Sequence, residues 1–178
     1  MPRRQLPEDF DGWALFAALD RQREERGLSW RGVAEEIWSM SDELNAERPG
    51  DHPIAPATIT NISGNGDTSC QHALFFLRWL GRSPESFVPD AGDTDAPLPE
   101  VGPGRRPRWH LGRTYDALDA RRRAEGLTWK ALADELQCTP SQLTGLRTAR
   151  YATSMRLAMR ICRWLGRPAT DFVYAGRW

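Results

Sequence analysis

The chain has 178 residues, of which 40% are hydrophobic and 27% charged, a composition typical of globular proteins. No apolar run approaches the ~20 residues that a membrane-spanning helix needs, and the N-terminal arginines are not followed by the apolar stretch of a secretion signal. Three cysteines, Cys70, Cys138 and Cys162, form an odd, sparse set that suits a reducing compartment. We therefore expect a cytoplasmic protein that does not enter membranes, with one or two small domains.

A net charge of zero conceals a strong asymmetry along the chain. Residues 1–100 contain 9 Lys and Arg against 18 Asp and Glu, whereas residues 101–178 contain 15 against 6. A split of this size predicts that the basic part meets a polyanion and the acidic part does not. The alternative is that helix faces of opposite sign attract each other within the molecule.

Two long stretches of the chain nearly repeat each other. Residues 19–37 read LDRQREERGLSWRGVAEEI, and residues 118–136 read LDARRRAEGLTWKALADEL. Further on, FFLRWLGRSPESFV (75–88) matches RICRWLGRPATDFV (160–173). Such a repeat indicates one supersecondary unit used twice.

The first copy defines a domain at residues 1–88 in which the apolar residues follow helical spacing. No segment of either copy alternates in the way that argues for a strand, so an all-α fold is expected for both domains. Trp13, Phe16 and Leu19 lie in its opening segment, and the residues predicted to line the following helices are Val33, Ala34 and Ile37, then Ile59 and Ile62, and finally Leu74, Leu77 and Leu80.

An insertion at residues 38–55 distinguishes the first copy from the second. Between Ile37 and Pro56 lie 18 residues, where the second copy has 3. We expect the second helix to continue through Leu44 and a loop to follow. Trp38, at the start of the insertion, is the aromatic residue predicted to face a partner.

Residues 89–107, PDAGDTDAPLPEVGPGRRP, are rich in Pro, Gly and Asp and show no apolar period. They are predicted to form a linker, kept semi-extended by its prolines.

The second copy defines a domain at residues 108–178 with strong helix boundary signals. Gly126 is expected to end the first helix, and Thr128 and Thr139 are expected to cap the next two. Pro140 takes the first position of the third helix, where its missing N–H costs nothing. The predicted inward-facing residues of the first, second and fourth helices are Trp109, Leu111, Tyr115 and Leu118, then Trp129, Leu132, Ala133 and Leu136, and then Leu157, Ile161, Cys162 and Leu165.

Three segments carry a resemblance to a known family: GLTW (126–129), LADEL (132–136) and TPSQLTGL (139–146). They resemble the lambda-repressor-like, Xre-type helix-turn-helix family, whose usual pattern is LAxxLGxSxxxISxI. The resemblance implies two small five-helix domains in tandem, and the first copy matches less cleanly. One departure is Gln137, which stands in the turn where the family usually has Gly.

In such a domain the third helix, here residues 140–147, enters the DNA major groove with its N-terminal residues toward the base edges. The resemblance therefore implies sequence-specific binding of double-stranded DNA in transcription regulation, in the manner of a repressor. Gln142 is suited to bidentate pairing with adenine. The predicted base-contacting residues are Ser141, Gln142, Thr144 and Gly145, and the predicted phosphate-contacting residues are Thr128, Lys130, Arg147, Thr148 and Arg150.

The first copy offers no positive charge on its third helix, where Thr58 and Asn61 face outward. We predict that it mainly binds a protein partner or a second copy of the chain. The competing hypothesis is a second DNA half-site read through Thr58 and Asn61. An alternative for the whole chain is an antitoxin-like or scaffold module in which DNA binding is secondary.

Enzymatic chemistry is not expected. His52, His72 and His110 are scattered and never stand at ligand spacing with a cysteine, and no nucleophile arrangement or phosphate-binding loop is present. The sequence therefore predicts no catalytic residue, no metal site and no cofactor.

Overall fold

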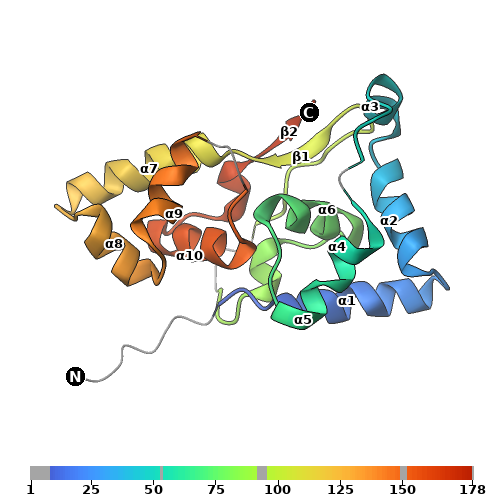
Figure 1. The fold of residues 1–178 in the computed structure, drawn as a ribbon, viewed down its shortest axis with the longest axis horizontal. Coiled ribbons are helices and arrows are strands. Elements are labelled where there is room, and N and C mark those ends of the chain that lie inside the picture. The colour runs from blue at the N-terminus through green and yellow to red at the C-terminus, as the bar shows by residue number, and fades with distance from the viewer. Residues whose placement is uncertain (1–8, 53, 92–95, 149–151, 178) are drawn as a thin grey trace.

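The computed structural model describes residues 9–52, 54–91, 96–148 and 152–177. It is mostly helical, with one small two-stranded sheet (Figure 1). Within these ranges no helix is long and apolar enough to cross a membrane.

The first repeat (residues 10–88) consists of helices that begin at side-chain caps. Asp11, Ser29 and Ser69 each accept the backbone N–H three residues on, at 2.9, 3.1 and 3.0 Å. Gly81 adopts the left-handed conformation, φ 65°, and ends the last long helix. The elements are α1 (Gly12–Glu25), α2 (Trp30–Ser39), α3 (Asp42–Glu47), α4 (Pro56–Thr60), α5 (Ile62–Asn65), α6 (Cys70–Leu80) and the 3-10 helix η1 (Pro84–Phe87).

The second repeat (residues 106–176) uses the same devices, and the predicted boundaries at Gly126, Thr128 and Thr139 are confirmed. Thr128, Thr139 and Ser154 cap its helices, and Gly126 and Gly166 follow helix ends with φ 67° and 65°. The elements are β1 (Arg106–Trp109), α7 (Leu111–Ala124), α8 (Trp129–Leu136), α9 (Pro140–Thr144), the 3-10 helix η3 (Gly145–Thr148), α10 (Met155–Leu165), the 3-10 helix η4 (Ala169–Phe172) and β2 (Val173–Gly176).

The repeats share side-chain contacts as well as elements. In each, a tryptophan of the last long helix donates its indole N–H to a glutamate of the second helix, at 3.0 Å. In each, an aromatic residue of the first helix stacks on the tryptophan that opens the second. The pairs are Trp79–Glu36, Trp164–Glu135, Phe16–Trp30 and Tyr115–Trp129.

The expectation that no strand forms is wrong. Strands β1 and β2 pair antiparallel, with Arg106 opposite Gly176 and Trp109 opposite Val173. Trp109, expected in the first helix, lies in β1, and α7 begins at Leu111. Four-residue strands are too short to show alternation in the sequence, and tertiary packing joins the two ends of the repeat.

The second helix does not continue through Leu44, contrary to the prediction. Helix α2 ends at Ser39, and α3 begins after a turn at Met40 and Ser41. The Arg78 guanidinium binds this turn, donating to the Met40 carbonyl at 2.7 Å and to Ser41 Oγ at 2.8 Å. A half-buried charge that takes its acceptors from the turn explains the break.

The segment at residues 96–105 lies against the first repeat. The Val101 carbonyl accepts from Arg78 at 2.7 Å, the Pro103 carbonyl from the backbone N–H of Leu44 at 3.2 Å, and the Arg105 carbonyl from Ser41 Oγ at 2.7 Å. The predicted linker is therefore bound along this part of its length, and its last residues form the start of β1.

One hydrophobic cluster runs through both repeats. It includes Leu74 and Phe76 of α6 and Leu157 and Ile161 of α10, all buried. Helices α6 and α10 contact each other, and β1 packs on α6. The two copies therefore share a continuous core.

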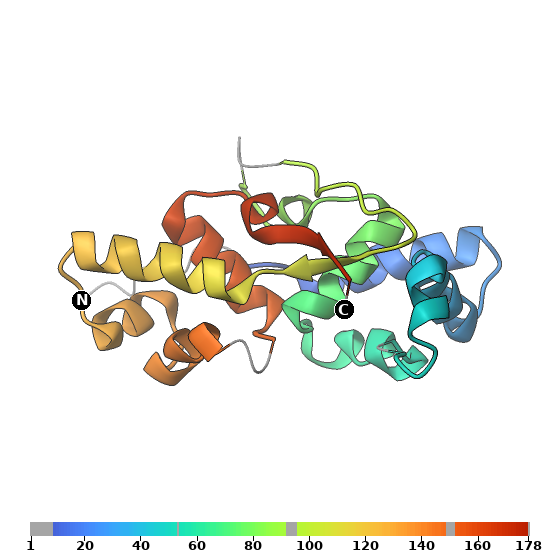
Figure 2. The same cartoon turned by 90° about the horizontal axis from the view of Figure 1, so that it is seen from above.

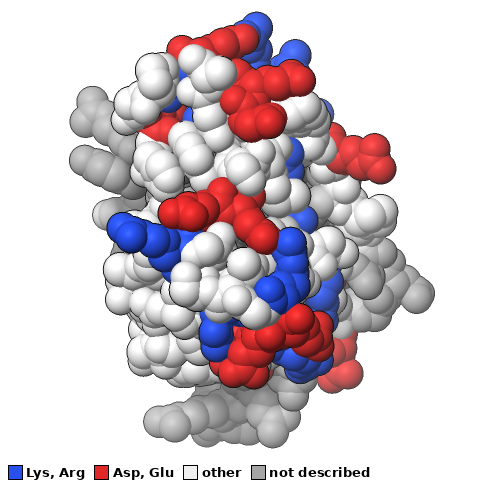
Figure 3. Space-filling model, turned by 90° about the vertical axis from the view of Figure 1, so that its right-hand side faces the viewer, with Lys and Arg blue, Asp and Glu red and all other residues white. Residues whose placement is uncertain are grey.

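Ion pairs that join the two parts of the chain run from acids of residues 1–100 to arginines of residues 101–178. Their shortest N···O distances are 2.6 Å in the pairs Asp9–Arg160, Glu47–Arg177 and Asp51–Arg106. On the face shown in Figure 3, acidic and basic groups are interspersed. Part of the opposite charge of the two parts is therefore paired within the molecule, as expected if their helix faces attract each other.

Candidate nucleic-acid interface

The turn between α8 and α9 is tight and strained. Helix α8 ends at Leu136, and Gln137 adopts φ 54°, ψ 50°, the left-handed region in which a residue other than glycine is disfavoured. The Cys138 N–H then donates to the Ala133 carbonyl at 3.0 Å. Cys138 is half-buried, and this burial raises the pKa of its thiol to about 11. The thiol is therefore a neutral packing group.

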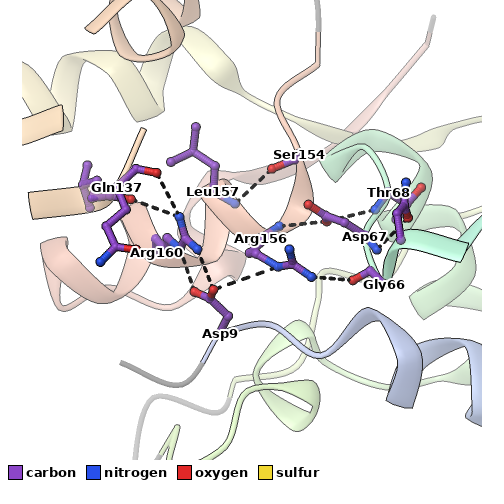
Figure 4. A network of polar contacts seen from close by, with 11 residues as sticks. Asp9, Gly66, Asp67, Thr68, Gln137, Ser154, Arg156, Leu157 and Arg160 are labelled. Atoms are coloured by element: carbon purple, nitrogen blue, oxygen red, sulfur yellow. Dashed lines mark hydrogen bonds and ion pairs between the residues drawn. The ribbon is translucent and has the colours of Figure 1, made fainter. Parts of the chain in front are cut away.

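Arg160 of α10 forms hydrogen bonds with this turn. Its guanidinium donates to the carbonyls of Leu136 and Gln137, at 3.2 and 3.3 Å (Figure 4). The Asp9 carboxylate accepts two further hydrogen bonds from the same group, at 2.6 and 2.7 Å, and they raise the pKa of Arg160. A residue of the first part of the chain thus helps to fix the turn of the second repeat.

Helix α9 begins with a capping box. Thr139 Oγ1 accepts from the Gln142 N–H at 3.3 Å, and Gln142 Oε1 accepts from the Thr139 N–H at 2.9 Å. The box fixes the Gln142 side chain at the start of the helix. Bidentate pairing with adenine needs Oε1 as the acceptor, and that atom is already engaged; the amide Nε2 donor remains for a base acceptor.

The α9–η3 segment has one apolar and one polar side. Leu143 and Leu146 are buried, at 0% and 2% exposure. The structure brings the predicted base-contacting residues together on the exposed side: Ser141, Gln142, Thr144 and Gly145. A Cβ added to Gly145 would meet nothing within 4 Å, so the backbone there is open to solvent.

The predicted phosphate-contacting residues flank this surface, and they differ in whether their polar groups already have partners within the protein. Arg147 is exposed and forms no ion pair within the described ranges. Lys130 pairs with Asp134 at 3.0 Å, and both side chains are so exposed that the pair contributes little to stability. Thr128 and Thr148 are exposed, but the Thr128 hydroxyl caps α8 and that of Thr148 donates to the Gly145 carbonyl. Arg150 lies outside the described residues.

The first repeat presents the counterpart of this surface on α4 and α5. Ile59 and Ile62 are buried like Leu143 and Leu146, and Asn61 is exposed. Thr58, at the position equivalent to Gln142, accepts the Ala55 N–H through Oγ1 at 3.3 Å. The outward side is thus only partly conserved as a polar surface: Thr58 replaces Gln142, whereas Ala57 replaces Ser141.

Sequence reasoning missed one cation in the first repeat. Arg31 lies in the first turn of α2, at the position equivalent to Lys130, and is exposed. Unlike Lys130 it forms no ion pair with the described residues, although Glu35 stands four residues on. Alignment of the two repeats pairs Arg31 with Lys130 and would have identified Arg31 as a candidate phosphate-contacting residue.

Trp38, predicted to face a partner, contacts residues of its own chain. Its ring stacks on His52 at 4.5 Å between centroids and lies 4.6 Å from the Arg106 guanidinium carbon. Arg106 also donates to Asp51 at 2.6 Å and to Asn45 at 3.1 Å. The insertion therefore surrounds the buried side chain at the start of β1.

Comparisons of the chain with family models, with curated proteins and with solved structures find no match.

Proposed function

We propose that the chain is a tandem helix-turn-helix protein of the lambda-repressor-like type that binds double-stranded DNA in a sequence-specific manner and regulates transcription. The observation that carries the proposal is the α8–turn–α9 unit. Its α9–η3 segment buries two leucines and exposes a polar side that ends in Arg147, which forms no ion pair with the described residues. These are the requirements for a helix that lies in a major groove ~12 Å wide.

Each part of the unit has a role in this proposal. Ser141, Thr144 and the Gln142 amide contact base edges, and Arg147 contacts a phosphate at the end of the helix. Lys130 reaches the backbone after exchanging Asp134 for a phosphate, which costs little because the pair is exposed. Phosphate contacts supply much of the affinity, and base contacts supply the sequence preference.

A pair of substitutions tests the proposed surface. Arg147→Ala should weaken binding to all duplexes alike and lower the slope of log K against log salt by about one. Gln142→Glu keeps an acceptor for the Thr139 N–H, so the fold is retained, but it removes the amide donor and places a negative charge at the groove. It should relax the sequence preference at the bases under α9 and weaken binding at least ~10-fold.

Arg21→Ala is the matched control because it removes one exposed arginine from α1, an element outside the proposed surface. Titration of labelled duplexes at several salt concentrations measures all three variants. If Arg147→Ala and Gln142→Glu bind like Arg21→Ala, the α9–η3 surface is not the DNA interface.

A further inference from the structure

The two repeats meet through a reciprocal pair of backbone hydrogen bonds. The Cys70 N–H donates to the Thr153 carbonyl at 2.8 Å, and the Met155 N–H donates to the Thr68 carbonyl at 2.7 Å. Cys70 and Met155 each open the last long helix of their repeat, so equivalent positions exchange equivalent bonds. This exchange is the signature of a local two-fold axis, as in a symmetric dimer.

A second set of contacts joins the two repeats on one side of these backbone hydrogen bonds. Arg156 donates to the Gly66 carbonyl at 3.1 Å, and its backbone N–H donates to the Asp67 carboxylate at 3.1 Å (Figure 4). Asp67 follows α5, and Arg156 lies in the first turn of α10. Together with the continuous core, these bonds set the position of one repeat relative to the other.

A two-fold rotation keeps every element at the same height along its axis. Helices α4 and α5 and their counterparts α9 and η3 therefore lie at the same level, and Figure 2 shows both segments on one side of the molecule. A duplex has local two-fold axes of its own, which is why symmetric proteins meet two half-sites on one face of the DNA.

The first repeat carries on this side a surface that fits the same ligand. Thr58 and Asn61 offer hydrogen-bonding groups without charge, and Arg31 supplies an exposed cation at the position where the second repeat has Lys130. The partner expected here is thus the same duplex rather than a separate protein. Because Ser63 stands where the second repeat has Arg147, the first repeat holds the DNA more weakly.

Resting on the proposed function, we infer that one chain, acting alone, reads a two-part asymmetric DNA site. The second repeat anchors the duplex through α9, η3 and Arg147. The first repeat contacts a neighbouring half-site of different sequence through Thr58, Asn61 and Arg31. The spacing between the two parts is fixed because the repeats are joined by the reciprocal bonds and the common core.

The test uses the full chain and a duplex enriched by it from a random library. Hydroxyl-radical footprinting should show two protected patches about one helical turn, ~10 base pairs, apart, with one chain per duplex by analytical ultracentrifugation. Insertion of ~5 base pairs between them, half a turn, should lower the affinity at least ~10-fold.

Variants of the first repeat separate this inference from the proposed function. Thr58→Ala combined with Asn61→Ala should remove sequence preference in the weaker patch alone, and Arg31→Ala should lower the salt slope by about one. A single protected patch, two chains per duplex, or variants that bind like Arg21→Ala would overturn the two-part site. If Arg147→Ala still weakens binding in that case, the proposed function survives. A wild-type chain that enriches no duplex refutes both.

Discussion

The contacts of Arg106 explain the structural role of the insertion at residues 38–55. Its side chain is almost fully buried, and three residues of the insertion surround it: Trp38, Asn45 and Asp51. A buried guanidinium needs such partners, because burying a charge without them is costly. The insertion thus secures β1 to the first repeat, and it lies in the turn where the second repeat keeps only three residues.

The Asp51–Arg106 pair makes stability depend on pH. The hydrogen bond from Arg106 lowers the pKa of the Asp51 carboxyl below its ordinary 3.8. A lowered carboxyl pKa contributes stability above the unfolded-state value, and this contribution is lost as the pH falls through the folded-state value. Asp51→Asn should therefore lower the free energy of unfolding at neutral pH, and the deficit should shrink below about pH 3.8.

Urea unfolding of wild type and Asp51→Asn at about pH 7, 5 and 3 measures this difference. Exposed Asp42→Asn serves as the control, because no ion pair of Asp42 is present in the described part of the chain. A deficit of the same size at all three pH values would show that Asp51 acts through packing and not through its charge.

At the scale of elements, the α8–α9 turn is the most specialised part of the molecule. Gln137 holds a left-handed conformation, and Arg160 binds its carbonyl and that of Leu136. The turn fixes the angle between two helices that the proposed function uses together. The strain at Gln137 is offset by bonds that come from α10 and, through Asp9, from the first part of the chain.

Gln137→Gly should relieve the strain without altering the surface. A residue with a Cβ in the left-handed conformation costs about 1–2 kcal/mol, and glycine removes this cost from the folded state. Glycine also raises the conformational entropy of the unfolded chain, which opposes part of the stabilisation. We therefore expect the free energy of unfolding to rise by about 0.5–1 kcal/mol. Chemical denaturation measures the stability, and the DNA titration should be unchanged. A destabilised variant would mean that the Gln137 side chain makes a contact that matters.

Much of the helical framework could be predicted because its signals are local. Caps such as Thr128 and Thr139, glycines such as Gly126, and the spacing of leucines each fix a boundary within a few residues of sequence. The outward side of α9 follows directly from the buried positions of Leu143 and Leu146. These features set the candidate site.

The remaining features depend on contacts between distant residues. Strand β1 exists because it pairs with the distant β2, with Arg106 opposite Gly176 and Trp109 opposite Val173. Helix α2 stops because Arg78 binds the following turn. The engagement of Gln142 Oε1 in a cap and the placement of α4 and α9 on one side of the molecule likewise depend on the folded arrangement. Arg31 is different, since a closer alignment of the two repeats identifies it.

At the scale of the whole molecule, the two copies behave as one folding unit. The hydrophobic cluster is continuous, and hydrogen bonds, ion pairs and the segment at residues 96–105 cross between the repeats. A protein with one core unfolds in one cooperative transition. The coupling also means that DNA binding by either repeat is best measured in the full chain.

Leu74→Ala tests this cooperativity. Leu74 is fully buried in α6, and its truncation should lower the free energy of unfolding by about 2–5 kcal/mol. Hydrogen exchange should report the loss in the slowest amides of α10 as well as in those of α6, because both exchange through the same global opening. Loss of protection confined to the first repeat would indicate two independent units.

The central claim is that this chain reads duplex DNA through the outward side of α9. Selection from a random duplex library by the full chain, repeated with Gln142→Glu, tests it most directly. We predict that the wild-type chain enriches a defined sequence and that Gln142→Glu, with its capping acceptor intact, loses the base preference under α9. Failure of the wild-type chain to enrich any sequence, or enrichment of the same sequence by Gln142→Glu, would contradict the claim.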